Sequence, residues 1–142
     1  MLQISKNVFE FITEHATKGL PHEVCGYLAA KDGRIIAHYE LTNMDASADH
    51  FSMKPEEQFA AVKDMRQKGL KLAASYHSHP ETPARPSEED IKLAYDPEIS
   101  YVIISMAEHN PDIKSFRIRK NEVTAEGIEI FNDEENCKGW KN

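Results

Sequence analysis

The feature that most constrains the fold is a nearly continuous apolar run, Tyr101–Ala107. A run without polar alternation is typical of a β-strand that is buried on both faces. It is far shorter than the ~20 residues that a membrane-spanning helix needs. We therefore expect a sheet in which this strand lies inside the molecule and is covered on both sides.

Three segments have the pattern of helices. The first spans residues 5–18, where Ser5 can cap the start and Gly19 ends the apolar spacing. The second spans residues 55–68, with proline at its first position and acidic residues in its first turn. Its inward face is predicted to consist of Phe59, Val62 and Met65. A short third helix begins at Ser87 and stops before residue 96.

Further strands are predicted between these helices. Residues 26–30 and 34–40 are joined by an Asp-Gly turn, which is a hairpin signal. A strand over residues 70–77 follows the second helix, and residues 113–119 and 122–130 form a closing hairpin. Because hairpins exclude a wholly parallel sheet, the sequence predicts an α/β fold with a mixed central sheet flanked by helices.

The length of 142 residues is that of a single domain. We expect this domain to cover residues 1–131 and a polar tail to cover residues 132–142. The two cysteines, Cys25 and Cys137, lie far apart and are expected to be free thiols.

The formal net charge of −7 argues against nucleic acid and anionic membranes as partners, since both favour Lys/Arg patches. The start of the chain does not have the pattern of an export signal, so a cytoplasmic location is expected. The sequence leaves the oligomeric state open.

The residues that indicate chemistry are His77 and His79, followed by Asp90. Residues two apart on a strand share a face, so the two imidazoles can lie side by side. Asp90 falls in the first turn of the third helix, which a short loop can bring over the strand. Two imidazoles and one carboxylate form a zinc site with a fourth position open for water. Taken alone, a His-x-His pair is weak support for a metal, and Ser87-x-x-Asp90 is an ordinary capping box.

Glu23 is a candidate for the base that such a site needs, because it lies just before a strand. Spacing by itself does not select it from the other acidic residues. Cys25 is expected to be a small buried residue and not a nucleophile. His22 is expected to be a surface histidine, with a supporting role beside Glu23 as the alternative.

Glu23, the segment His77-Ser-His79-Pro and Ser87-x-x-Asp90, with ten residues between His79 and Asp90, together resemble the signature of the JAMM (MPN+) metallopeptidases. The similarity extends over about residues 5–130. It implies a cytidine-deaminase-like, JAMM-type fold and one zinc ion per chain, held by His77, His79 and Asp90. It also implies that Glu23 is the general acid/base and that Ser87 stabilises the oxyanion.

The family's reaction is hydrolysis of peptide or isopeptide bonds, often at the C-terminal tail of a ubiquitin-like β-grasp protein. Only ten residues separate Asp90 from Tyr101, so the insertion of the deubiquitinating members is missing. The chain resembles the compact prokaryotic members, which favours the tail of a sulfur-carrier β-grasp protein as substrate. Two alternatives stay open: a non-catalytic scaffold of the same fold, and a zinc hydrolase of thioesters or small amides.

Overall fold

A computed structural model describes residues 1–133 as one mixed α/β domain. Eight strands and three helices lie within these residues, in the order β1 (Leu2–Ser5), α1 (Lys6–Gly19), β2 (Cys25–Lys31), β3 (Arg34–Leu41), α2 (Pro55–Gln67), β4 (Lys71–His79), α3 (Glu88–Lys92), β5 (Ser100–Ser105), β6 (Asp112–Arg119), β7 (Glu122–Glu126) and β8 (Ile128–Phe131). The predicted class, a mixed sheet flanked by helices, is confirmed.

The strands form a single sheet in the order β7-β6-β5-β4-β2-β3-β1-β8. The two edge strands, β7 and β8, are separated in the chain by Gly127 alone, and the Gly127 carbonyl accepts a hydrogen bond from the Leu2 amide at 2.8 Å. The sheet must therefore curl until its two edges meet, which the cumulative right-handed twist of eight strands allows. The prediction of one strand over residues 122–130 is wrong, because its two halves are separate strands at opposite edges of the sheet, where β7 pairs with β6 and β8 with β1.

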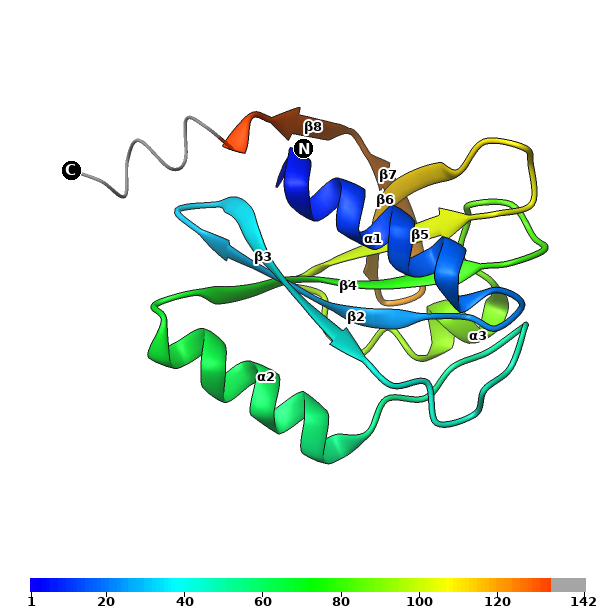
Figure 1. Cartoon of the computed structure of the whole chain (residues 1–142), viewed down its shortest axis with the longest axis horizontal. Helices are drawn as coiled ribbons and strands as arrows, with labels where there is room; N and C mark the ends of the chain where they lie inside the picture. The colour runs from blue at the N-terminus through cyan, green and yellow to red at the C-terminus, as the bar shows by residue number, and fades with distance from the viewer. Residues whose placement is uncertain (134–142) are drawn as a thin grey trace.

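Helices cover the two faces of the sheet (Figure 1). Helix α1 packs on one face of the curled sheet, against β1, β3, β5 and β8. Helix α2 packs on the opposite face, against β3 and β4. Strand β5 contributes Val102 and Ile104 to the core beneath α1, and Ile103 to a separate cluster with Phe116. The central apolar run is thus buried on both faces, as predicted.

The helices begin where the sequence predicts, but one apolar face differs. Ser5 caps α1, since its hydroxyl accepts a hydrogen bond from the Val8 amide at 3.2 Å. In α2 the predicted inward position of Phe59 is wrong, because this side chain is 76% exposed. The buried residues of α2 are Ala61 and Met65, four apart, and a residue two before Ala61 lies on the opposite side of a helix.

Strand β1 was not predicted, whereas the hairpin was. Residues 25–41 form the antiparallel pair β2–β3, and positive φ angles at Asp32 (52°) and Gly33 (80°) build the tight turn between them. Strand β1 has only four residues and pairs in parallel with β3 and β8, so the local sequence pattern does not reveal it.

The last strand, β8, ends at Phe131. The expected boundary between a domain and a tail at residues 131/132 stays a prediction, because most of the expected tail, including Cys137, lies outside the described residues. None of the helices in residues 1–133 is long and apolar enough to cross a membrane.

Candidate metal centre

Two of the three candidate ligands lie at the end of β4. This strand continues to His79, two residues beyond the predicted end, so both histidines belong to its regular alternation. It lies between β2 and β5, where His77 is paired with Cys25 on one side and Ile103 on the other. Pairing on both sides holds the strand rigidly, and each of the two histidines is 4% exposed.

The third candidate ligand, Asp90, lies in the first turn of α3. The Ser87 hydroxyl accepts a hydrogen bond from the Asp90 amide at 3.0 Å, and Asp90 Oδ2 accepts one from the Ser87 amide at 3.0 Å. This reciprocal pair is the capping box that the sequence predicts. It fixes both the start of α3 and the direction of the Asp90 carboxylate.

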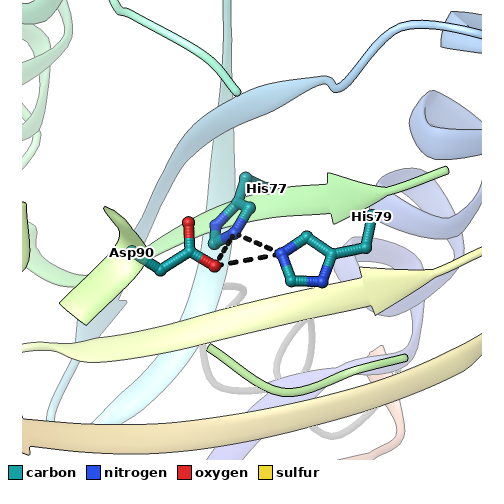
Figure 2. Close-up of side chains that lie close together, drawn as sticks. All are labelled: His77, His79 and Asp90. Atoms are coloured by element: carbon teal, nitrogen blue, oxygen red, sulfur yellow. Dashed lines mark hydrogen bonds and ion pairs between the residues drawn. The ribbon is translucent and has the colours of Figure 1, made fainter. Parts of the chain in front are cut away.

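The three side chains point toward one another, as Figure 2 shows. Asp90 Oδ2 lies 3.1 Å from His77 Nε2 and 3.0 Å from His79 Nε2, and the two Nε2 atoms are 3.1 Å apart. Three converging atoms of this kind could hold a metal ion. Nitrogen and carboxylate oxygen are ligands that zinc accepts, and three of them leave a fourth position open.

The surroundings of His79 fit a metal ligand. Its Nδ1 donates a hydrogen bond to the Pro83 carbonyl at 2.8 Å, so the proton of the neutral ring is on Nδ1 and the lone pair of Nε2 faces the cluster. Burial lowers the pKa of His79, but Asp90 and the Pro83 carbonyl raise it more, to above its usual value. A cation at the cluster would take the place of the proton that Asp90 attracts.

The Asp90 carboxyl is ionised in this environment. Burial alone would raise its pKa, but hydrogen bonds from His77 and His79 and from the Ser87 amide hold the pKa well below its usual range. A charged carboxylate beside two imidazoles is the form that binds a cation.

Glu23 lies beside this cluster, two residues before the start of β2. It is 4% exposed, and its Oε1 atom has no hydrogen-bond partner within residues 1–133. The pKa of Glu23 is raised to about 8, and burial is the main cause. Of the nearby charges, that of His79 lowers this pKa and that of Asp90 raises it. A buried carboxyl without a partner is costly to keep, and perturbed groups of this kind are concentrated at functional sites.

The other predicted residues have the expected surroundings. Ser87 is exposed at the start of α3, and His22 is exposed beside Glu23. Cys25 is fully buried, and burial raises the pKa of its thiol to about 12, which does not suit a nucleophile.

Sequence reasoning missed three residues that support the site. The Phe51 ring stacks on His77 with 4.7 Å between ring centroids, and Pro83 orients His79 through its carbonyl. The Ser78 hydroxyl accepts a hydrogen bond from the Val24 amide at 2.8 Å, and so joins β4 to the residue after Glu23. The position of Ser78 between the two histidines was visible, but its partner lies 54 residues away.

A pocket of about 370 Å³ opens beside the cluster and includes His77 and Asp90 in its wall. The rest of the wall is mainly apolar and aromatic, and comes from β2, β4, β5, β6, the segment before α2 and the segment after α3, with Tyr27, Phe51, Met53, Leu72, Leu93, Tyr95, Ile99, Tyr101, Ile103 and Ile118 as its larger members. A pocket of this size and composition is typical of ligand sites.

The chain is similar to several known proteins. The chain is 32% identical to the CysO-cysteine peptidase of Mycobacterium tuberculosis over 133 residues, which cover 92% of this chain and 91% of that protein. It is 32% identical to the desampylase of Haloferax volcanii over 73% of this chain and 80% of that protein. The solution structure of a protein from Desulfitobacterium hafniense is similar with a TM-score of 0.85 and 47% identity, over 93% of this chain and 94% of that one.

A family model described as prokaryotic homologues of the JAB domain matches residues 5–119. That range holds Glu23, both histidines, Ser87 and Asp90. The chain therefore belongs to the prokaryotic JAB-domain family, the prokaryotic JAMM type that its sequence resembles.

Proposed function

We propose that this chain is a zinc metallopeptidase that hydrolyses a peptide or isopeptide bond at the C-terminal tail of a ubiquitin-like β-grasp protein of the sulfur-carrier kind. The observation that carries the proposal is the convergence of His77, His79 and Asp90 beside the buried carboxyl group of Glu23. A structural zinc site would be closed by a fourth protein ligand, whereas three ligands are the catalytic arrangement.

His77, His79 and Asp90 would hold one zinc ion per chain. A zinc ion at such a site lowers the pKa of water and polarises the scissile carbonyl. Glu23 would accept a proton from the attacking water and deliver it to the leaving amine. Its raised pKa suits both steps, because the group can hold or release a proton near neutral pH.

Ser87 would stabilise the oxyanion that develops on the carbonyl. Its hydroxyl oxygen accepts the hydrogen bond of the Asp90 amide, and its own hydrogen can still be donated. The residue that caps α3 would thereby also face the developing charge.

The pocket beside the cluster supports a polypeptide tail as substrate. Its apolar walls can hold an extended segment while the scissile bond lies at His77 and Asp90. The chain between α3 and β5, residues 93–99, is too short for an added substrate-binding insertion. This favours a small carrier protein over a ubiquitin chain. Relatives named as a CysO-cysteine peptidase and a desampylase support a hydrolase over a scaffold.

Mass spectrometry of β-grasp carrier proteins that are extended beyond a terminal Gly-Gly tests the proposal. Wild-type protein is expected to release the extension and leave a carrier that ends in Gly-Gly. Glu23→Gln should retain zinc and lose about 10²- to 10⁴-fold in rate, because it removes the proton carrier and none of the ligands.

The matched control is His22→Ala, which changes the exposed neighbour of Glu23 and should cleave at the wild-type rate. A Glu23→Gln protein with full activity would contradict the assigned base. Cleavage of small amides or thioesters with intact carriers would point to the non-peptide alternative. A wild-type protein that cannot be loaded with about one zinc per chain would favour the scaffold.

A further inference from the structure

The segment between β3 and α2, residues 42–54, runs from the end of β3 to the start of α2 (Figure 1) and contacts the candidate metal centre through Phe51. We call it the β3–α2 loop. Its Phe51 ring stacks on His77, and its Met53 lines the apolar pocket. The carbonyl of Ser47 accepts a hydrogen bond from the Glu23 amide at 2.7 Å. The loop therefore touches a candidate ligand, the pocket and the candidate base.

The side chain of Asn43 joins the two ends of this loop. Its Oδ1 accepts hydrogen bonds from the amides of Asp45 at 3.0 Å and Ser52 at 3.2 Å. Its Nδ2 donates to the carbonyls of Glu23 at 3.0 Å and His50 at 3.2 Å. These four bonds use both donors and both acceptor sites of the amide, so no other side chain of similar size can make them all.

The backbone of Glu23 is held by this loop on both sides. Its amide donates to Ser47 and its carbonyl accepts from Asn43, while the next residue, Val24, is bound to Ser78 on β4. The Glu23 carboxyl, in contrast, has an Oε1 atom that meets no donor in the part of the chain that the structure describes. No hydrogen bond to this atom fixes the direction of the carboxyl group, so the place of the group depends on where the backbone of Glu23 is held.

We propose that Asn43 is a positioning residue, which ties the β3–α2 loop to the backbone of Glu23 and so aims the carboxyl group at the metal cluster. The proposal rests on the proposed function for its kinetic consequence. A displacement of about 1 Å in a reacting group can cost about 100-fold in rate. Loss of the bond from Asn43 to Glu23 should therefore lower kcat and leave the three ligand positions, on β4 and α3, in place.

Two variants separate the bonds of Asn43. Asn43→Ala removes all four. Asn43→Asp retains an acceptor for the amides of Asp45 and Ser52, but sets a carboxylate oxygen against the carbonyl of Glu23. Both are expected to lose about 10- to 100-fold in kcat with a KM within about threefold of wild type and one zinc per chain.

The control is Ser47→Ala in the same loop. It removes the hydrogen bonds between the Ser47 hydroxyl and Asp49, but keeps the Ser47 carbonyl that binds Glu23. Its kcat should stay within about twofold of wild type, since surface changes of this kind have small effects. An Asn43→Asp protein with the kcat of wild type would overturn the proposal.

A double-mutant cycle tests whether Asn43 acts through Glu23. In the Glu23→Gln background, Asn43→Ala should cause less than about a twofold further loss of the residual rate, because the group that it positions is already disabled. If Asn43→Ala lowered the rate by the same factor in the wild-type and Glu23→Gln backgrounds, the proposal would be overturned.

Hydrogen exchange of the Glu23 amide gives a readout that needs no substrate. In both Asn43 variants this amide should exchange at least about tenfold faster, while the amide of Tyr27, which lies in regular register between β3 and β4, stays protected as the internal reference. Unchanged exchange at Glu23 would overturn the proposal even if the wild-type protein cleaved no carrier. If only the proposed function were wrong, the variants would still differ from wild type in exchange at Glu23, but there would be no difference in kcat to measure.

Discussion

The Glu23 carboxyl group is almost fully buried, and its Oε1 atom accepts no hydrogen bond from any of residues 1–133. In a protein selected for stability alone, this position would hold a neutral or apolar side chain. The group is tolerable because burial raises its pKa to about 8 and so favours the protonated form. A zinc ion at the cluster would favour the carboxylate again, since an opposite charge lowers the pKa.

This environment predicts that Glu23→Gln stabilises the metal-free protein at high pH. The pKa of Glu23 in the folded protein lies above its ordinary value of 4.5, so the folded state binds the proton more tightly than the unfolded state. The contribution of Glu23 to the free energy of unfolding is therefore largest below pH 4.5 and falls as the pH rises through about 8. Glu23→Gln does not titrate, and it should be more stable than wild type by about 1–3 kcal/mol at pH 9.

Urea unfolding of the metal-free wild-type and Glu23→Gln proteins at pH 5 and pH 9 measures this difference. The gain from the substitution should be larger at pH 9. His22→Ala, which changes an exposed group, should alter the free energy of unfolding by less than about 0.5 kcal/mol at either pH. An equal gain for Glu23→Gln at both pH values would contradict the raised pKa.

At the scale of secondary-structure elements, α3 shows how a local signal serves two purposes. A helix of five residues is only marginally stable by itself, so its start depends on the cap made by Ser87 and Asp90. The same cap directs Asp90 Oδ2 toward the two histidines of β4. Capping and the candidate metal site are therefore different consequences of one short sequence.

Substitutions of Ser87 can separate the cap from the proposed oxyanion contact. Ser87→Gly should cost only a few tenths of a kcal/mol in stability, because glycine is an acceptable cap, whereas Ser87→Ala should cost about 1 kcal/mol. Both remove the hydroxyl and should lower kcat by about 10²-fold, while Ser87→Thr should retain cap and hydroxyl.

Thermal unfolding and steady-state kinetics of the three variants check this prediction. If activity followed stability, so that Ser87→Gly cleaved like wild type and Ser87→Ala did not, the role of Ser87 would be capping alone.

At the scale of the whole molecule, the candidate ligands join parts of the fold that share few other contacts. His77 and His79 belong to a strand that is paired on both sides, while Asp90 belongs to a short helix with no buried residue. A metal ion would cross-link the two. Because the unfolded chain does not hold the three atoms together, binding energy would appear as folding energy.

Zinc should therefore raise the thermal stability of the wild-type protein. At a free zinc concentration of 100 times Kd the gain is about 2.7 kcal/mol, which corresponds to roughly 5–10 °C in Tm for a domain of this size. His77→Ala should lose this shift, whereas His22→Ala should keep it. Calorimetry with and without a chelator measures the shift, and an equal shift in His77→Ala would place the zinc elsewhere.

Much of the fold could be predicted from local patterns. The apolar run at residues 101–107, the Asp-Gly turn after β2 and the caps of α1 and α3 each depend on neighbouring residues, and each prediction is confirmed. The membership in the prokaryotic JAMM-type family is confirmed as well.

Two predictions are wrong, and both depend on contacts between remote parts of the chain. The division into β7 and β8 and the exposure of Phe59 depend on which distant segments cover a strand or a helix face.

For the candidate site, local sequence patterns predict which side chains are candidate ligands and part of their geometry. Strand periodicity places His77 and His79 on one face, and the capping box places Asp90 at the start of α3. Three features become visible only in the folded chain: Asp90 meets both histidines, Glu23 is buried beside them, and Asn43 binds the backbone of Glu23. The physical reason is the range of the interactions: caps and strand alternation act between near neighbours in the chain, whereas burial and these contacts arise only when remote segments pack together.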